Sequence, residues 1–259
     1  MLRIGEPHYL STLPLYHSLR KRQDPDLELF PGGLTELSTR LANKELDAGP
    51  VSVVEYLAHP DRFRMLPNVA LSSVGRSLCV TLFSRRPAYE LADARIAVPA
   101  TAPGPVALLR WLMREMYRLE PTLVARTGGL RESLAEHDAV LLFQDAALEA
   151  HAGTADLFQI WDLGEAWWQI TNTPFIYMLW AARSDLLEDD VAAITLAFDA
   201  AKANAPALGG EILAEAQRRS AIPRTLLEGY FNRFRYDFTT SQQEGLEAYR
   251  QALATLVTV

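Results

Sequence analysis

Apolar and polar positions near the start of the chain predict a strand, a loop and a helix in that order. Leu2–Gly5 has the apolar character of a short buried strand, Glu6–Leu13 is a polar loop, and Pro14 opens a helical run. Proline is well tolerated in a first helical turn because the N–H group there has no intrahelical partner. Ser11 and Thr12 place two hydroxyls just before that turn. Such a helix start suits an anion, although Ser and Thr before a helix are also common caps.

The same order of elements continues through the next forty residues. Strands are predicted over 27–30 and 47–51, and helices over 34–46 and 53–58. A βαβα succession of this kind predicts parallel strands that are joined by right-handed crossovers.

A second series of strands and helices follows a basic, Pro-interrupted stretch. Two β-rich runs lie on either side of Gly75-Arg76, and Arg85-Arg86-Pro87 then breaks the pattern. Beyond it, the pattern predicts strands over 94–98, 122–125, 138–143 and 157–161, and helices over 106–117, from 144 and over 163–170. We interpret the break as a crossover into a second lobe.

A continuous apolar run over 174–182 predicts a strand that is buried on both faces, which we interpret as the return crossover. Everything after Arg183 is predicted to be helical, and Thr240 and Ser241 with Gln243 and Glu244 form a capping box before the last helix. The predicted fold is α/β and two-lobed. Lobe one comprises 1–85 and 183–259, lobe two comprises 86–182, and a ligand cleft is expected between them.

Composition narrows the class of protein. A chain of 259 residues, 49% of them hydrophobic, is long enough for one or two domains with a sizeable core. The net charge of −7, without a basic block, argues against a nucleic-acid binder. We also expect no membrane span and a cytoplasmic protein, since the chain has no long apolar run and begins with a strand. Cys79 is the only cysteine and the histidines lack ligand spacing, so no disulfide or metal site is expected.

The loops at the predicted carboxyl ends of strands share one chemistry. They are rich in Ser, Thr, Gly and Pro, which leaves hydroxyls and backbone N–H groups available for a carboxylate or a phosphate. Taken singly, each Ser or Thr is better explained as a turn or cap residue, and only the convergence of six such loops favours a binding site. These loops cover residues 6–13, 50–53, 72–77, 99–105, 144–145 and 167–174.

Familiar catalytic sets are missing from these loops. The sequence shows no Ser/His/Asp or Cys/His arrangement, no P-loop and no dinucleotide fingerprint. Asp145 and Glu55 are candidate bases, but Asp145 also fits as an acid at a helix start and Glu55 as a charge on a helix face.

Four segments carry a resemblance to a known family. They are RIGEPHYLSTLPLYHSL, GGLTELSTRLANKELDAGPVSVVEYLAHPDRFRMLP, LSSVGRSLCVTLFSRRP and DLGEAWWQITNTPFIYMLWAAR, in this order along about two-thirds of the chain. The chain resembles the menaquinone-biosynthesis chorismate dehydratases of the futalosine pathway. That resemblance implies the two-lobed fold of type II periplasmic binding proteins. Ser11 stands where the family usually has Asn, and the loop PATAPGPVAL keeps Thr101 but few other hydroxyls.

The resemblance also implies an activity and a set of site residues. Chorismate would lose water to give 3-[(1-carboxyvinyl)oxy]benzoate, with no cofactor and no metal, and the partner would be this small molecule and not a nucleic acid or a membrane. Ser11, Ser73 and Ser77 are the predicted catalytic residues. The predicted substrate-binding residues are Tyr9, Thr12, Ser52, Ser72, Gly75, Arg76, Thr101, Gly104, Asp145, Trp167 and Thr173.

Two alternatives remain open from the sequence. A binding protein of the same fold would capture a small carboxylate without chemistry, and fold alone does not separate it from an enzyme. The effector domain of a transcriptional regulator is a third possibility, but the sequence shows no N-terminal helix-turn-helix. The oligomeric state is not predicted.

Overall fold

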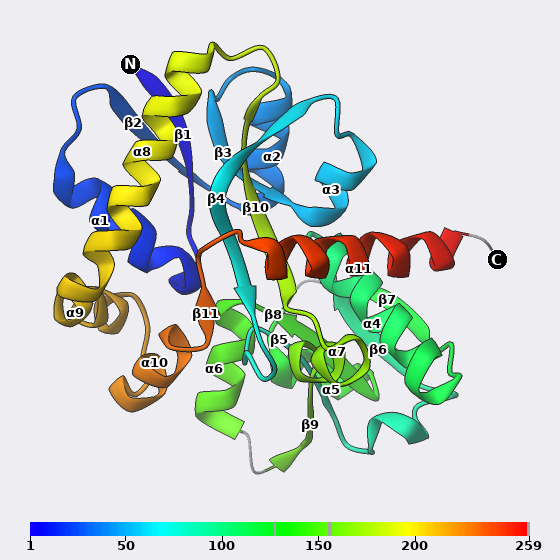
Figure 1. Cartoon of the computed structure of the whole chain (residues 1–259). Helices are drawn as coiled ribbons and strands as arrows, with labels where there is room; N and C mark the ends of the chain where they lie inside the picture. The colour runs from blue at the N-terminus through cyan, green and yellow to red at the C-terminus, as the bar shows by residue number, and fades with distance from the viewer. Residues whose placement is uncertain (127, 155–156, 258–259) are drawn as a thin grey trace. The chain divides into compact units, whose positions relative to one another are not determined.

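A computed structural model describes residues 1–126, 128–154 and 157–257, and the chain divides into two compact units (Figure 1). Unit 1 comprises residues 1–72 and 176–243. Unit 2 comprises residues 73–175 and the described chain from Glu244 onward. Each unit contains its own β-sheet, and the α/β fold class predicted from the sequence is confirmed.

The sheet of unit 1 has the strand order β11-β4-β10-β3-β1-β2. Strand β1 pairs in parallel with β2 and β3, while β10 runs antiparallel to β3. The carboxyl ends of β1 and β3 therefore meet at one edge, which brings together the loops that follow them. The strands are β1 (Leu2–Pro7), β2 (Leu27–Gly32), β3 (Ala48–Ser52), β4 (Phe63–Ser73), β10 (Phe175–Arg183) and β11 (Phe234–Arg235).

Helices of unit 1 pack on this sheet around a buried aromatic cluster. Trp180 of β10 lies against Tyr16, and Phe198 meets the Tyr16 ring edge-on with 6.0 Å between centroids. The Tyr16 hydroxyl donates to the Gly5 carbonyl at 2.7 Å and accepts from Trp180 Nε1 at 2.8 Å, so these buried polar atoms are paired. The helices are η1 (Leu10–Thr12), α1 (Leu13–Arg22), α2 (Leu34–Ala42), α3 (Val53–Ala58), α8 (Glu188–Asn204), η4 (Ala205–Leu208), α9 (Gly209–Arg219) and α10 (Arg224–Phe231).

The sheet of unit 2 has the strand order β7-β6-β8-β5-β9. Strand β6 is parallel to β7 and β8, and β5 is antiparallel to β8 and β9. The strands are β5 (Val80–Ser84), β6 (Arg95–Pro99), β7 (Thr122–Arg126), β8 (Ala139–Phe143) and β9 (Gln159–Asp162). The helices are η2 (Ala88–Glu90), α4 (Pro103–Tyr117), α5 (Leu130–Glu136), α6 (Asp145–Thr154), α7 (Leu163–Thr171) and, from Glu244, α11 (Thr240–Val257).

The unit boundaries differ from the predicted lobes of 1–85 plus 183–259 and 86–182. The division falls after Ser72, before the basic stretch, because β5 pairs with β8 and β9 in the sheet of unit 2. Strand β10 returns earlier than predicted and pairs with β3 in unit 1. Helix α11 belongs largely to unit 2, where Tyr249 packs on Trp167 with ring centroids 5.7 Å apart.

Two details of the C-terminal region also correct the sequence interpretation. The region after Arg183 is not wholly helical, because it contains the two-residue strand β11. The cap of α11 lies one residue earlier than the predicted box, since Gln242 Oε1 accepts from Thr239 N at 3.1 Å. Within the described part of the chain, the helices are all too short or too polar to span a bilayer.

Candidate functional site

The loop after β1 buries the two predicted hydroxyl residues of unit 1. Ser11 and Thr12 are 0% and 1% exposed, and both lie in η1 immediately before α1. Thr12 does not cap α1 with its side chain, because its hydroxyl donates to the Tyr9 carbonyl at 2.8 Å and so closes the loop. Tyr9 is half-buried and His8 is exposed.

Two further serines of unit 1 have different local roles. Ser52 follows β3 and caps α3, since its hydroxyl accepts from Glu55 N at 3.1 Å. Ser72 is fully buried near the end of β4, where its hydroxyl donates to the Arg235 carbonyl and accepts from Gln242 Nε2, each at 3.4 Å. The cap interpretation therefore accounts for Ser52, whereas Ser72 is tied to the segment that follows α10.

Residues far along the chain hold Ser11 and Ser72 within unit 1. The Tyr236 hydroxyl donates to the Ser11 carbonyl at 2.8 Å. Tyr236 directly follows Arg235, whose carbonyl meets Ser72. Two consecutive residues thus connect the loop after β1 with the end of β4.

The first predicted loop of unit 2 is a tight turn between β4 and β5. Gly75 has φ +70°, in the left-handed region where a side chain is strained, and Leu78 has φ +63°. The Asp162 carboxylate supports this turn, because one of its oxygens accepts from Ser77 N at 3.1 Å and from Leu78 N at 2.7 Å. Ser77 is fully buried and its hydroxyl accepts from Cys79 N at 3.1 Å.

Asp162 is itself the N-cap of α7. Its second oxygen accepts from Glu165 N at 3.1 Å, so three backbone N–H groups surround a carboxylate that is 3% exposed. Burial raises the pKa of Asp162, while the three N–H donors favour its ionised form. With its oxygens occupied, Asp162 fixes the geometry of the turn.

The remaining members of that turn differ in exposure. Ser73 is 1% exposed and its hydroxyl donates to the Gly75 carbonyl at 3.4 Å. Arg76, by contrast, is exposed.

The loop after β8 lies beside the turn. Gln144 N donates to the Cys79 carbonyl at 2.7 Å, and Asp145 then begins α6. Because β5 is antiparallel to β8, its amino end lies at the carboxyl end of β8. One edge of the sheet therefore gathers Ser77, Asp145 and Asp162.

The loop after β6 is shorter than predicted. Helix α4 begins at Pro103, three residues before the apolar run that predicted it, and Thr101 is exposed. Gly104 lies in the first helical turn and is buried, and its carbonyl accepts from the Tyr249 hydroxyl at 2.8 Å. Tyr249 of α11 thus supports the start of α4.

Trp167, one of the predicted substrate-binding residues, lies in the core of unit 2. It is 0% exposed and packs on Trp111, Phe175 and Tyr249 with ring centroids 5.2, 5.5 and 5.7 Å apart. Among the described residues its indole N–H has no hydrogen-bond partner. Thr173 lies after α7, with its hydroxyl 3.0 Å from that of Thr171.

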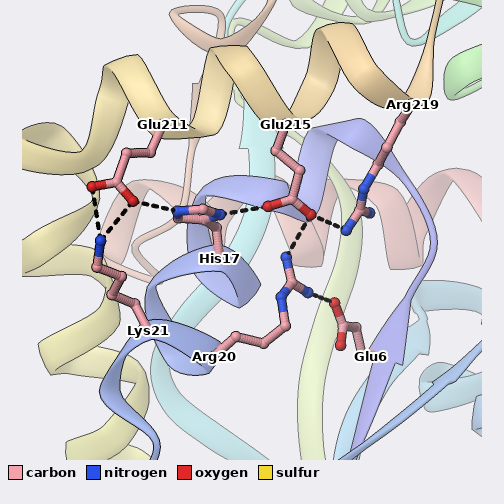
Figure 2. A network of polar contacts seen from close by, with 7 residues as sticks. All are labelled: Glu6, His17, Arg20, Lys21, Glu211, Glu215 and Arg219. Carbon is pink, nitrogen blue, oxygen red and sulfur yellow. Dashed lines mark hydrogen bonds and ion pairs between the residues drawn. The ribbon is translucent and has the colours of Figure 1, made fainter.

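Glu6, the acidic residue that precedes the Ser11 turn in the sequence, is engaged in an ion-pair network (Figure 2). Glu6 of β1 pairs with Arg20, which also pairs with Glu215 at 2.9 Å. His17 lies between Glu215, at 2.5 Å, and Glu211, at 3.3 Å. The network joins α1 to α9 and leaves Glu6 paired with a guanidinium.

No group of three or more His, Cys, Asp or Glu side chains within ranges 1–126, 128–154 and 157–257 is arranged to hold a metal ion. A cavity of about 550 Å³ in unit 1 lies among α1, η4, α9, α10 and the residues after β11. None of the predicted site residues lines this cavity, although Tyr236 does.

Sequence reasoning missed residues that hold the predicted loops, among them Asp162, Tyr236 and Tyr249. Asp162 carried a signal, because an Asp followed three residues later by Glu165 before an apolar run is a helix-cap pattern. Tyr236 and Tyr249 carried none, because their partners are 225 and 145 residues away along the chain.

Comparison with known proteins places the chain among relatives. It is 30% identical to a chorismate dehydratase of Thermus thermophilus, over 96% of this chain and 94% of the relative. Protein AF1704 of Archaeoglobus fulgidus matches in structure with a TM-score of 0.81 at 20% identity, over 100% of this chain and 98% of that one. The periplasmic aliphatic sulphonate-binding protein SsuA of Escherichia coli matches with a TM-score of 0.70 at 12% identity, over 98% and 85%.

These similarities settle the fold and the family. The structural matches give a periplasmic-binding-protein-like fold, as the sequence predicted. The model of a family described as menaquinone biosynthesis matches residues 2–255, nearly the whole length of the chain. The chain therefore belongs to the menaquinone biosynthesis family.

Proposed function

We propose that the protein is a chorismate dehydratase that produces 3-[(1-carboxyvinyl)oxy]benzoate for menaquinone biosynthesis by the futalosine pathway. The observation that carries the proposal is 30% identity to a chorismate dehydratase over 96% of the chain, within a family match over residues 2–255. As an enzyme of biosynthesis, it would work in the cytoplasm with chorismate as its small-molecule partner.

The reaction demands little covalent chemistry from the protein. Loss of the C3 proton and the C4 hydroxyl as water makes the ring aromatic, which supplies a large driving force. The ring carboxylate is conjugated with the diene and accepts negative charge when the proton leaves first. The protein has to orient two carboxylates and stabilise the departing hydroxyl with hydrogen-bond donors. Loops rich in hydroxyls and backbone N–H groups, with few ionisable side chains, suit that task.

We assign this task to loops of both units. In unit 1, Ser11 would donate a hydrogen bond to the substrate from the buried turn before α1. In unit 2, Ser73 and Ser77 would act from the turn that Asp162 supports. The hydrogen bonds that fix the turns around the three serines support these roles, because a hydroxyl in a fixed loop loses little freedom on binding a substrate.

We further propose that the enolpyruvyl carboxylate of chorismate removes the C3 proton. That carboxylate is attached to C3 through one ether oxygen, so it reaches the proton without any entropy of association. The protein offers few competing bases in the predicted loops or beside them. Glu6 is paired with Arg20, and Asp162 accepts three backbone hydrogen bonds. His8, which is exposed, and Asp145, at the start of α6, are the contrasting candidates for a protein base.

One assay tests the proposed activity against simple binding. Chorismate is added to the purified protein and the ultraviolet spectrum is followed for a substituted benzoate, with the product identified by mass. Conversion is the expected result. A complex in which chorismate persists unchanged would instead favour a binding protein for small carboxylates.

A further inference from the structure

Tyr236 connects two stretches of unit 1 that the sequence pointed to separately. Its backbone carbonyl accepts from Ala70 N at 3.1 Å, which fixes it beside β4. Its hydroxyl donates to the Ser11 carbonyl at 2.8 Å. Tyr236 therefore connects the turn before α1 with the sheet of unit 1.

The Ser11 turn depends on such an anchor. Helix η1 is only three residues long, and its N-cap residue Tyr9 makes no side-chain capping hydrogen bond. Short 3₁₀ turns have few internal hydrogen bonds and weaker geometry than an α-helix. Burial raises the pKa of the Tyr236 phenol, so the hydroxyl stays protonated and remains a donor throughout the physiological pH range.

We propose that Tyr236 is a positioning residue, which sets the place of the Ser11 hydroxyl by holding the Ser11 carbonyl. The inference rests on the proposed function, in which Ser11 acts on chorismate. Other residues of the same segment hold Ser72, because the Arg235 carbonyl accepts a hydrogen bond from the Ser72 hydroxyl and Gln242 Nε2 donates one to it. The segment 234–242 thus holds two predicted site serines of unit 1.

The first test removes only the hydroxyl. Tyr236→Phe keeps the ring that lines the unit 1 cavity and should lower kcat roughly 10- to 100-fold with little change in KM, since a small misplacement of a reacting group costs about that much. Tyr16→Phe is the matched control. It also deletes a tyrosine hydroxyl that donates to a carbonyl in unit 1, that of Gly5, and it should lower Tm but leave kcat within about twofold. Equal kinetic effects of the two variants would overturn the proposal.

The second test asks whether Tyr236 acts through Ser11. Single variants Ser11→Ala and Tyr236→Phe are compared with the double variant. If Tyr236 serves to place the Ser11 hydroxyl, the double variant should be no slower than Ser11→Ala alone. A double variant whose losses multiply would show that Tyr236 affects the rate by another route.

A third measurement needs no turnover. Amide hydrogen exchange of residues 10–13 should be faster in Tyr236→Phe than in the unchanged protein or in Tyr16→Phe. If the unchanged protein does not convert chorismate, the proposed function fails while this comparison still decides whether Tyr236 anchors the turn. Unaltered exchange in residues 10–13 would refute the anchor itself.

Discussion

At the scale of single residues, Asp162 is a buried carboxylate that accepts three backbone hydrogen bonds. Two donors come from the strained turn at Ser77 and Leu78, and a third comes from the first turn of α7. A buried backbone N–H without an acceptor costs about as much as a lost hydrogen bond. The carboxylate therefore stabilises the positive φ of Leu78, a backbone conformation that leucine does not favour by itself.

Asp162→Asn should destabilise the protein by about 1–3 kcal/mol and reduce turnover of chorismate, because an amide NH₂ would face at least one of these N–H donors. Urea unfolding and kcat measure the two effects. Asp138→Asn is a suitable control, since Asp138 also accepts a backbone N–H, from Arg95 at 2.9 Å, but is half-exposed. Equal destabilisation by both changes would contradict a special role for the buried site.

Ser11→Ala should raise the barrier to dehydration by about 1–3 kcal/mol, because a buried hydrogen bond to the substrate would be lost. The measured quantity is kcat/KM for chorismate. Ser18→Ala serves as the control, because Ser18 is a buried serine of α1 whose hydroxyl has no partner among the described residues. The control should change neither stability nor rate appreciably. A normal kcat/KM in Ser11→Ala would show that Ser11 only shapes the loop.

At the scale of elements, the contact between α1 and α9 depends on charge as well as on packing. Burial acts to raise the pKa of Glu215, but the hydrogen bond from His17 and the charges of Arg20 and Arg219 outweigh it, so the pKa is lowered (Figure 2). A carboxyl whose pKa is lowered by folding stabilises the folded protein fully at pH values above its unfolded pKa of about 4.3. That contribution is lost as pH falls through the lower, folded value.

Glu215→Gln should therefore reduce the free energy of unfolding at pH 7 by about 1–3 kcal/mol and flatten its decline in acid. Unfolding in urea at a series of pH values between 7 and 3 measures both. Glu211→Gln tests the exposed partner of His17 on the same helix and should have a smaller effect. Parallel pH curves for the original protein and Glu215→Gln would contradict the assignment.

Local pattern was enough to predict most elements of this fold, because periodicity and turn residues are properties of neighbouring positions. Helix α3 was predicted with the bounds it has, and β10 was displaced by one residue. The unit to which an element belongs depends on distant partners, and this was predicted wrongly for β5, β10 and α11. The two-residue strand β11 is too short for any periodicity to mark it.

The candidate site, too, was predicted only as far as local sequence patterns reach. Loops at strand ends were visible from the sequence, and within each unit the sheet order brings several of them to one edge. Trp167 packs in the core of unit 2, which its position did not reveal, because an aromatic residue in a helix beside a loop can serve as wall or core. Tyr236 and Tyr249 hold loops that lie 225 and 145 residues away along the chain, a separation at which a single sequence carries no signal.

At the scale of the whole molecule, each unit carries different residues that are proposed or contrasting candidates for the reaction. Unit 1 carries the buried Ser11 turn and the exposed His8, while unit 2 carries the Ser77 turn and Asp145. The two contrasting candidates for a protein base, His8 and Asp145, thus belong to different units. Single variants of each residue and the double variant therefore test whether either one removes the proton.

His8→Ala, Asp145→Asn and the double variant should each retain most of the single-turnover rate with chorismate, because the enolpyruvyl carboxylate is proposed as the base. A general base contributes up to about 10⁴-fold and must come within about 3 Å of the proton that it removes. A drop of that size in either single variant, with chorismate still bound, would identify a protein base and refute substrate assistance. Retention in the double variant would leave the substrate's own carboxylate as the group with the reach and the basicity to remove the C3 proton.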